Sequence, residues 1–302
     1  MTYEESIAVS AEIGRTIAQQ SPCIRYTEED LKNAEKAYSK EELEELKTLG
    51  LMPGEFETFY VLREFFSEMD LGSTTDGGYI AQLFRNGRHL DEKIFLADPF
   101  LSAVTVPDRS IGRFRLAHSS YERGEIFHYD MPDFEGRFVV PKLGFFSVPV
   151  SFPALYEGPI PWVSVCPSEI HSMEKAVRAA WGDTLVLGLG LGYYAFRISQ
   201  SETVRSVTVV EREQEVIDLF TEYLLPQFPM KEKVRILCGD AVSYTQSLRD
   251  GVYDFCFADI WEGAVDGAGP YCKIRNEAKR MVHTEFSYWI EPQIRAYLGE
   301  LP

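Results

Sequence analysis

Hydrophobic positions in the first part of the chain recur at the spacing of a helix. Three aliphatic residues repeat every four positions and so share one side of a helix: Val9, Ile13 and Ile17. Two helix starts are predicted where a Ser or Thr and an acidic residue three positions later cap one another's backbone: Thr27 with Asp30, and Ser39 with Glu42. A strongly aromatic run over residues 56–66 predicts a further helix packed in a core. The pattern therefore predicts a helical region over residues 1–92.

From residue 93 the apolar runs become shorter and lose the helical period. Three runs are predicted as strands: residues 111–119, 124–130 and 137–152. Seven prolines fall between Pro132 and Pro167. Since proline cannot donate to a sheet ladder, these strands must be short, bulged or at sheet edges. We expect a small β-rich subdomain and linker over residues 93–161.

After Pro167 apolar runs alternate regularly with helical stretches. A helix is expected to begin at Ser168 and to end at Gly182. Five short apolar runs then predict strands: TLVL, VTVV, VRILC, DFCFA and FSYWI. Nearly continuous apolar strands between helices are typical of a parallel sheet covered on both faces. The fold class predicted for residues 162–302 is therefore α/β, a Rossmann-like, doubly wound and mostly parallel sheet.

Composition narrows the classes of function. The chain has 302 residues, 45% of them hydrophobic and 25% charged, which is ordinary for two globular domains. Its formal net charge is −17 and it has no run of Lys or Arg, so nucleic acid is not an expected partner. An acidic surface instead suits a small neutral or cationic substrate.

Cysteine usage and hydropathy indicate the compartment. The five cysteines are scattered and never form a CxxC pair, which favours reduced thiols in a cytoplasmic protein. The acidic N-terminus lacks the apolar segment of a signal peptide, and no 18-residue apolar stretch occurs. We expect a cytoplasmic protein without a membrane span.

A glycine-rich segment lies between the first predicted strand of the sheet and the next helix. Glycine there allows a sharp turn and a close approach of the backbone to a ligand. The position three after Gly190 is Tyr193, whereas the dinucleotide fingerprint GxGxxG needs glycine. The segment therefore fits an NAD site poorly. The candidate ligand-binding residues of this segment are Gly188, Leu189, Gly190, Gly192 and Tyr193.

Three carboxylates fall where the next strands end. In an open parallel sheet, ligands bind over the carboxyl ends of the strands. Placed there, Glu211 can accept protons from both ribose hydroxyl groups, and Asp240 can accept from the exocyclic amine of adenine. Asp259 ends the fourth strand. Together with the glycine segment, these residues predict an adenosine site.

The order GLGLGY, VVERE, CGDA and FADIW resembles class I S-adenosylmethionine-dependent methyltransferases, and within them the branch that contains spermidine synthases. The resemblance covers about residues 168–290. It implies that the donor is held by the glycine loop, by Glu211 as the ribose ligand, by Asp240 and Ala241 at the adenine, and by Glu169 in the preceding helix. It also implies that Asp259 matches the aspartate that helps to deprotonate the attacking amine in the synthases.

Two departures from the synthase pattern bear on the reaction. Leu191 stands where the synthases have the aspartate that binds the donor's aminopropyl amine, and Ile260-Trp261 replaces the usual Ser or Thr after the fourth-strand Asp. Both argue against aminopropyl transfer. The favoured function is thus S-adenosylmethionine-dependent methyl transfer to an unidentified small molecule. Two alternatives stay open: a spermidine-synthase-like aminopropyltransferase, and a non-catalytic protein that binds an adenosyl ligand.

The same reasoning assigns residues to catalysis. Asp259 is expected to position or accept a proton of the acceptor. Trp261 and Glu262 are expected to line the mouth of the acceptor site, where an aromatic ring attracts a cation, although Trp261 suits plain packing equally well. No metal is expected, because the histidines share no ligand spacing such as HxxxH. No GxSxG elbow supports nucleophilic hydrolysis.

The predicted sheet stops after its fifth strand. Only residues 291–302 follow it, too few for the antiparallel strand pair that ends many methyltransferase sheets. An uncovered edge strand is a site of unwanted pairing, which natural sheets avoid. We therefore expect either the N-terminal region or a second copy of the chain, in a homodimer, to cover this edge.

Overall fold

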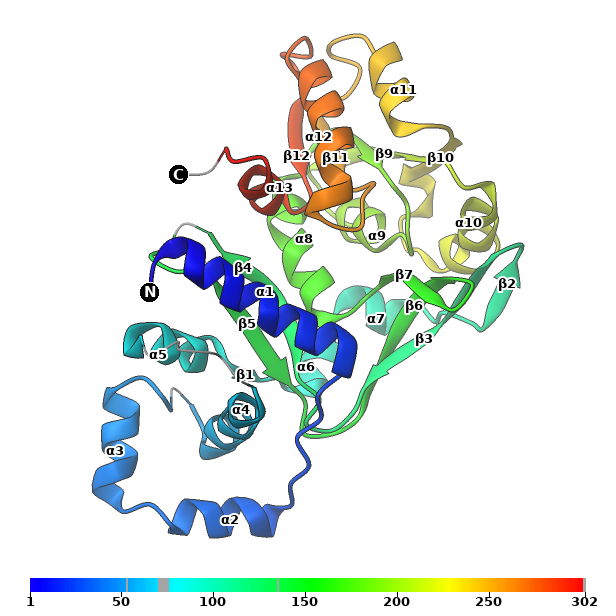
Figure 1. Cartoon of the computed structure of the whole chain (residues 1–302). Coiled ribbons are helices and arrows are strands. Elements are labelled where there is room, and N and C mark those ends of the chain that lie inside the picture. Colours follow the sequence, from blue (N-terminus) through cyan, green and yellow to red (C-terminus); the bar gives the residue numbers. More distant parts are fainter. Residues whose placement is uncertain (53, 70–75, 135, 301–302) are drawn as a thin grey trace. The chain divides into compact units, whose positions relative to one another are not determined.

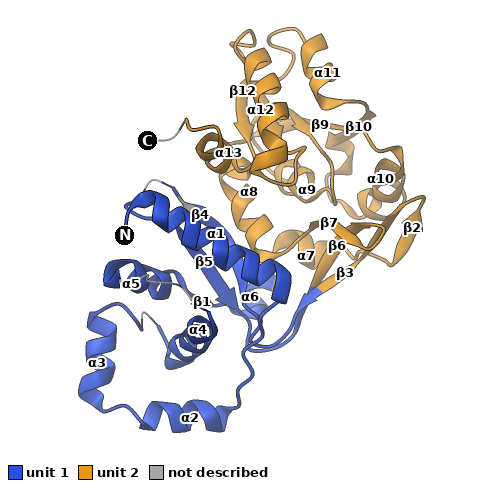
Figure 2. Cartoon of the chain, viewed as in Figure 1, with its two compact units in different colours: residues 1–95, 120–151 blue, residues 96–119, 152–302 orange. Residues whose placement is uncertain are grey.

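The computed structural model describes residues 1–52, 54–69, 76–134 and 136–300 (Figure 1). The chain forms two compact units, each built from two stretches of sequence (Figure 2). Unit 1 consists of residues 1–95 and 120–151, and unit 2 of residues 96–119 and 152–302. These units divide the chain by packing, whereas the predicted boundaries after residues 92 and 161 divide it by type of element. None of the helices in the described ranges is long and apolar enough to cross a membrane.

The helices of the N-terminal region begin where their capping residues predict. Thr27 and Ser39 each accept a hydrogen bond from the third residue of their helix, whose side chain accepts one in return, so both predicted capping boxes are confirmed. The helices are α1 (Tyr3–Gln20), α2 (Glu28–Lys36), α3 (Lys40–Thr48), α4 (Phe56–Glu68), α5 (Gly77–Asn86) and α6 (Glu92–Leu96).

A three-stranded sheet completes unit 1. Its strands lie in the order β1 (Arg88–His89), β5 (Val140–Phe145) and β4 (Phe127–Asp133). β1 runs parallel to β5, and β4 runs antiparallel to it. Helices α1 and α5 pack on β5, and the aromatic residues of α4 enter the core as predicted. The run over residues 137–152, predicted to add at least one strand, holds β5 and the start of β6, because the chain turns after Phe145.

Unit 2 contains a small antiparallel sheet. Its strands lie in the order β2 (Arg109–Ile111), β3 (Phe114–Tyr121), β6 (Val150–Glu157) and β7 (Ile160–Ser164). β6 and β7 form a hairpin that turns at Gly158. The short helix α7 (Pro99–Ala103) packs on a helix of the larger sheet, described next.

The larger sheet of unit 2 is wholly parallel and confirms the Rossmann-like α/β class. Its strands lie in the order β10 (Val234–Cys238), β9 (Val204–Glu211), β8 (Gly182–Leu187), β11 (Phe255–Ala258) and β12 (Glu285–Tyr288). All five predicted strands are present. The order places β8 at the centre, so the connections to its two neighbours diverge there and leave a crevice at the carboxyl ends of the strands.

Helices precede, connect and follow these strands (Figure 1). They are α8 (Pro167–Ala179), α9 (Tyr193–Ser199), α10 (Gln214–Leu219), α11 (Ala241–Ser247), α12 (Ala264–Ala278) and α13 (Glu291–Tyr297), with short turns at Phe220–Leu224, Leu225–Gln227 and Lys231–Lys233. The predicted start of α8 at Ser168 is wrong by two residues. Cys166 is the N-cap, because Pro167 has the fixed backbone angle that suits the first helical position.

Strand β12 lies at the edge of the parallel sheet, with β11 as its neighbour. It is only four residues long, and a short edge strand offers few free backbone groups to another chain. That the N-terminal region or a second copy covers this edge stays a prediction.

Candidate functional site

A cavity of about 910 Å³ opens at the carboxyl ends of β8, β9, β10 and β11, within unit 2. Its walls bring together nearly all of the residues that the sequence assigns to a site. These are Glu169, Gly188, Leu189, Gly190, Tyr193, Glu211, Asp240, Ala241, Asp259, Trp261 and Glu262. Gly192 is the one residue assigned to the site from the sequence that does not line the cavity. Its backbone has φ of +76°, and a Cβ there would meet the ring of Phe220, so this glycine is required for packing beside the cavity.

Gly188 is required by the close approach of two strand ends. Its φ is +100°, a conformation that only glycine adopts readily. A Cβ at this position would lie 1.9 Å from the main-chain oxygen of Asp259, which cannot move aside as a side chain would. This glycine therefore allows the end of β8 to lie directly against the end of β11.

Replacing Gly188 by Ala should destabilise the protein by more than about 2 kcal/mol, because it combines a strained φ with a backbone clash. Gly158→Ala is the matched control, since Gly158 also has a positive φ, of +59°, but a Cβ there would meet nothing within 4 Å. Urea unfolding of both variants measures the difference. Equal free energies of unfolding would show that the approach at Gly188 is not tight.

Glu211 is held in place at the end of β9 by two main-chain amides. Leu189 N donates to one carboxylate oxygen at 3.1 Å, and Glu213 N donates to the other at 2.9 Å. A carboxylate has about four acceptor sites, so two stay open toward the cavity. The glycine loop and the carboxylate thus fix one another, and the remaining sites suit a vicinal diol.

Asp240 has a structural role at the same time as it faces the cavity. It is the N-cap of α11, and one of its oxygens accepts from Ser243 N at 2.7 Å. The hydrogen bonds from Ser243 hold the pKa of this carboxyl below its usual range. Asp240 is therefore an ionised acceptor, with its second oxygen free of this capping bond. Ala241 follows it as the first residue of the helix.

Glu169 on α8 and Asp259 after β11 both line the cavity, and their carboxyl groups interact electrostatically. Burial and the neighbouring Asp259 raise the pKa of Glu169. Burial raises the pKa of Asp259 to about 7. Two carboxyl groups in such a place do not both ionise readily, so the pair holds a proton near neutral pH. Within the described ranges, no hydrogen bond joins either carboxyl group to the protein.

A chain of hydrogen bonds fixes the wall that carries these acids. The indole N–H of Trp261 donates to the main-chain oxygen of Trp289 at 3.2 Å, and the indole N–H of Trp289 donates to Ser172 Oγ at 2.8 Å. Ser172 Oγ donates in turn to the main-chain oxygen of Glu169 at 2.9 Å. Trp261 is buried and packs on Gly267, whereas the nearby Glu262 is exposed. Trp261 thus supports the wall as well as lining it.

The cavity also has a wall that sequence reasoning missed. Trp162, Val163 and Ser164 of β7 line it, although no strand was predicted there. Val163 lies against Gly190, 3.3 Å from where a Cβ would be, and the guanidinium of Arg212 lies over the ring of Trp162 at 5.9 Å. The run WVSV, mostly apolar and flanked by Pro161 and Pro167, was the available signal for a strand.

Tyr193 contacts a residue that the sequence did not single out. Its hydroxyl donates to Asp98 at 3.1 Å, and Arg197 donates to the same carboxylate at 2.9 Å. Asp98 also caps α7 by accepting from Phe100 N. This network ties the helix after the glycine loop to α7, so the Tyr193 ring is held where it borders the cavity.

Comparisons with known proteins do not assign this chain to a family. No family model matches the sequence, and no curated protein matches it. Among solved structures, precorrin 8W decarboxylase of Methanobacterium thermoautotrophicum is similar at 16% identity and a TM-score of 0.30, over 41% of this chain and 67% of that one. YcgJ of Bacillus subtilis is similar at 20% identity and a TM-score of 0.31, over 39% of this chain and 50% of that one. Monomeric WbdD is similar at 13% identity and a TM-score of 0.27, over 37% of this chain and 26% of that one. The chain therefore spans half or less of the last two, and scores at this level say nothing about function.

Proposed function

We propose that the cavity of unit 2 binds S-adenosylmethionine and that the protein transfers its methyl group to a small-molecule acceptor. The observation that carries the proposal is that one cavity gathers the glycine loop, Glu211, Asp240 and Asp259 at adjacent strand ends. The first three suit an adenosine, and Asp259 suits a reacting group next to it.

The residues fit an adenosine donor better than other nucleotides. Two open acceptor sites on Glu211 match the two hydroxyl groups of a free ribose, and a ribose phosphate would be repelled. An ionised Asp240 matches an amine donor such as that of adenine. Leu191 is buried where a carboxylate would be needed to bind an aminopropyl amine, so methyl transfer is the better match.

S-adenosylmethionine, when bound, supplies a methyl group that its sulfonium already activates. The protein then has to align the acceptor and remove its proton. Asp259 is the residue for the second task, because its raised pKa of about 7 makes it a stronger base than an ordinary carboxylate. Glu169 is a second buried acid beside it, whose own pKa burial and Asp259 raise, and Trp261 fixes the wall that carries them.

S-adenosylmethionine or S-adenosylhomocysteine should raise the melting temperature of the protein. A ligand that binds only the folded state at a hundredfold excess over its Kd stabilises it by about 2.7 kcal/mol. NAD should have a much smaller effect, because the glycine loop lacks the third glycine of its fingerprint. Differential scanning fluorimetry with the three ligands tests this, and stabilisation by NAD alone would refute the proposal.

A further inference from the structure

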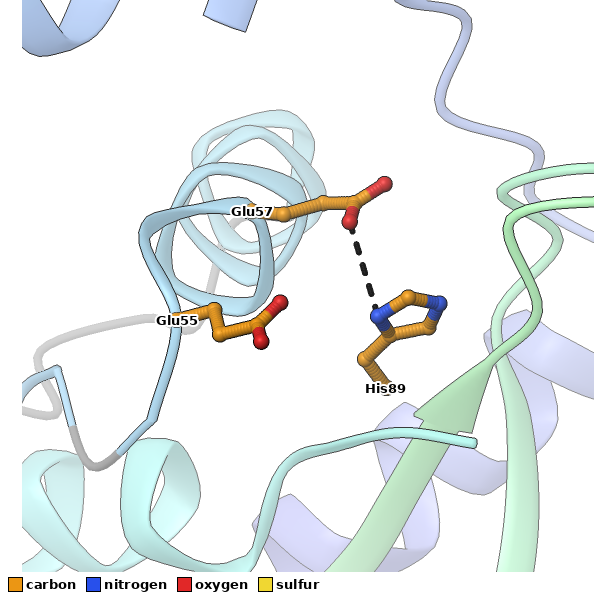
Figure 3. A group of neighbouring side chains, drawn as sticks. All are labelled: Glu55, Glu57 and His89. Atoms are coloured by element: carbon orange, nitrogen blue, oxygen red, sulfur yellow. Dashed lines mark ion pairs between the residues drawn. The ribbon is translucent and has the colours of Figure 1, made fainter. Parts of the chain in front are cut away.

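Unit 1 contains a cluster of metal-ligating side chains that has no part in the cavity of unit 2. Glu55 and Glu57 lie at the start of α4, and His89 lies in β1. One ligand atom from each residue lies within 4.8 Å of the others. Figure 3 shows both carboxylates extending from α4 toward the imidazole ring.

The local structure lets Glu55 and His89 turn toward one another. Glu55 is the N-cap of α4 but makes no side-chain capping bond, so its carboxylate is free to turn toward the cluster. The ring of His89 stacks on that of Phe145 in the neighbouring strand, with centroids 5.0 Å apart and planes 6° apart. This stacking fixes the direction of the imidazole nitrogens, as a metal ligand requires.

The spacing between Glu57 and His89 suits two ligands of one ion. Glu57 Oε2 and His89 Nδ1 lie 3.5 Å apart, longer than a normal hydrogen bond. Ligands about 2.1 Å from a tetrahedral ion lie about 3.4 Å from one another. The other oxygen of Glu57 accepts a hydrogen bond from the Tyr26 hydroxyl at 2.6 Å. Outer partners of this kind orient ligating carboxylates in metal sites.

A cavity of about 750 Å³ adjoins the cluster and leaves room for a further ligand. Glu55 and His89 both line it. Three basic residues share its wall: Arg85, Arg88 and Lys93. Arg88 is engaged with main-chain carbonyl groups of its own segment, and among the described residues none of the three forms an ion pair with Glu55 or Glu57. Their charge therefore does not take the place of a cation at the cluster.

We propose that Glu55, Glu57 and His89 bind a divalent transition-metal ion, with a water as the fourth ligand. Zn²⁺ fits best, because it accepts imidazole and carboxylate ligands together and tolerates three protein ligands. The proposal does not depend on the function of unit 2. It revises the expectation of no metal, since spacing along the sequence cannot show a histidine in β1 meeting two acids on α4.

Titration of the chelator-treated full chain, without an affinity tag, with Zn²⁺ should show one site per chain by calorimetry. Glu55→Gln and His89→Gln should each weaken Zn²⁺ binding at least tenfold. Glu92→Gln is the matched control, because Glu92 lines the same cavity outside the cluster and should leave the affinity unchanged. The Glu55 side chain is exposed and makes no capping hydrogen bond, so Glu55→Gln should leave the fold intact. It therefore tests the site even if His89→Gln fails to fold.

Two further measurements identify the ligands. Co²⁺ bound in place of Zn²⁺ should give a visible absorption spectrum that changes in His89→Gln, and Tyr26→Phe should weaken Zn²⁺ binding by about 10-fold to 100-fold. Absence of a Zn²⁺ site in the unaltered chain would overturn the proposal. So would equal affinity in the unaltered chain and in Glu55→Gln.

Discussion

Asp259→Asn should lower turnover by roughly 10²–10⁴, the usual contribution of a positioned proton acceptor, while the affinity for S-adenosylmethionine stays nearly unchanged. Asn preserves the size of the side chain but cannot take up a proton. An acceptor is needed first, and release of S-adenosylhomocysteine from a panel of polyamines, amino acids and small phenols would find one. Donor affinity measured by calorimetry then separates loss of chemistry from loss of binding.

The pH dependence sharpens this test. Because burial raises the pKa of Asp259 to about 7, the rate of the unaltered enzyme should rise with pH as this carboxyl ionises, and the Asn variant should lose that rise. The free energy of unfolding should instead fall as the pH rises. A raised pKa favours the protonated carboxyl in the folded state, so its contribution to stability is lost as the pH rises from about 4 through 7.

A purely structural Asp259 makes a different prediction. If the carboxylate were a cap, Asp259→Asn would reduce stability and leave the rate intact. No capping bond to this carboxylate occurs within the described ranges, and we expect the variant to be at least as stable as the unaltered protein at pH 8. A fully active but less stable variant would contradict the assignment and direct attention to Glu262 or Glu169.

Glu211→Ala should weaken S-adenosylmethionine binding at least tenfold. The substitution removes charge-assisted hydrogen bonds to the ribose, each of which contributes about 1.5–3 kcal/mol. It also removes the acceptor of Leu189 N, which holds the glycine loop. Calorimetry with S-adenosylhomocysteine measures the change, and circular dichroism confirms that the fold survives.

The chain offers a matched control two residues away. Glu213→Ala removes the same charge beyond the end of the same strand, but Glu213 itself does not line the cavity and pairs with Arg113, also outside it, and with Arg212 at its wall. Its effect on donor affinity should be small. If both variants bind the donor equally well, the ribose is not at the end of β9.

The elements that could be predicted from the sequence are those fixed by local rules. The two capping boxes and the five apolar strands follow from patterns a few residues long, and all of them are present. The start of α8 was misplaced because Ser168 is a good cap by type, while the preceding Pro167 decides where the helix begins. The rule for proline was the stronger one there.

The parts of the candidate site that could not be predicted depend on contacts between distant segments. Strand ends in a parallel sheet share one edge, so Glu211, Asp240 and Asp259 could be expected together. The wall formed by Trp162 could not, because it comes from a hairpin outside the sheet. The proximity of Glu169 to Asp259 likewise depends on how α8 packs, which no local pattern specifies.

The interleaving of the two units sets an order for folding during synthesis. Each unit needs two separate stretches of chain, and residues 96–119 of unit 2 are made before unit 1 receives its last strands. Unit 1 can be complete once residue 151 has left the ribosome, whereas unit 2 has to wait for β12, at Glu285–Tyr288. In the early stretch β2 can pair with β3 at once, but β3 has to wait for β6 at Val150–Glu157, a period in which its apolar residues are open to aggregation and to chaperones. It also follows that no truncation gives one complete unit by itself: a fragment with all of unit 1 also carries residues 96–119 of unit 2, and a fragment with all of unit 2 also carries residues 120–151 of unit 1.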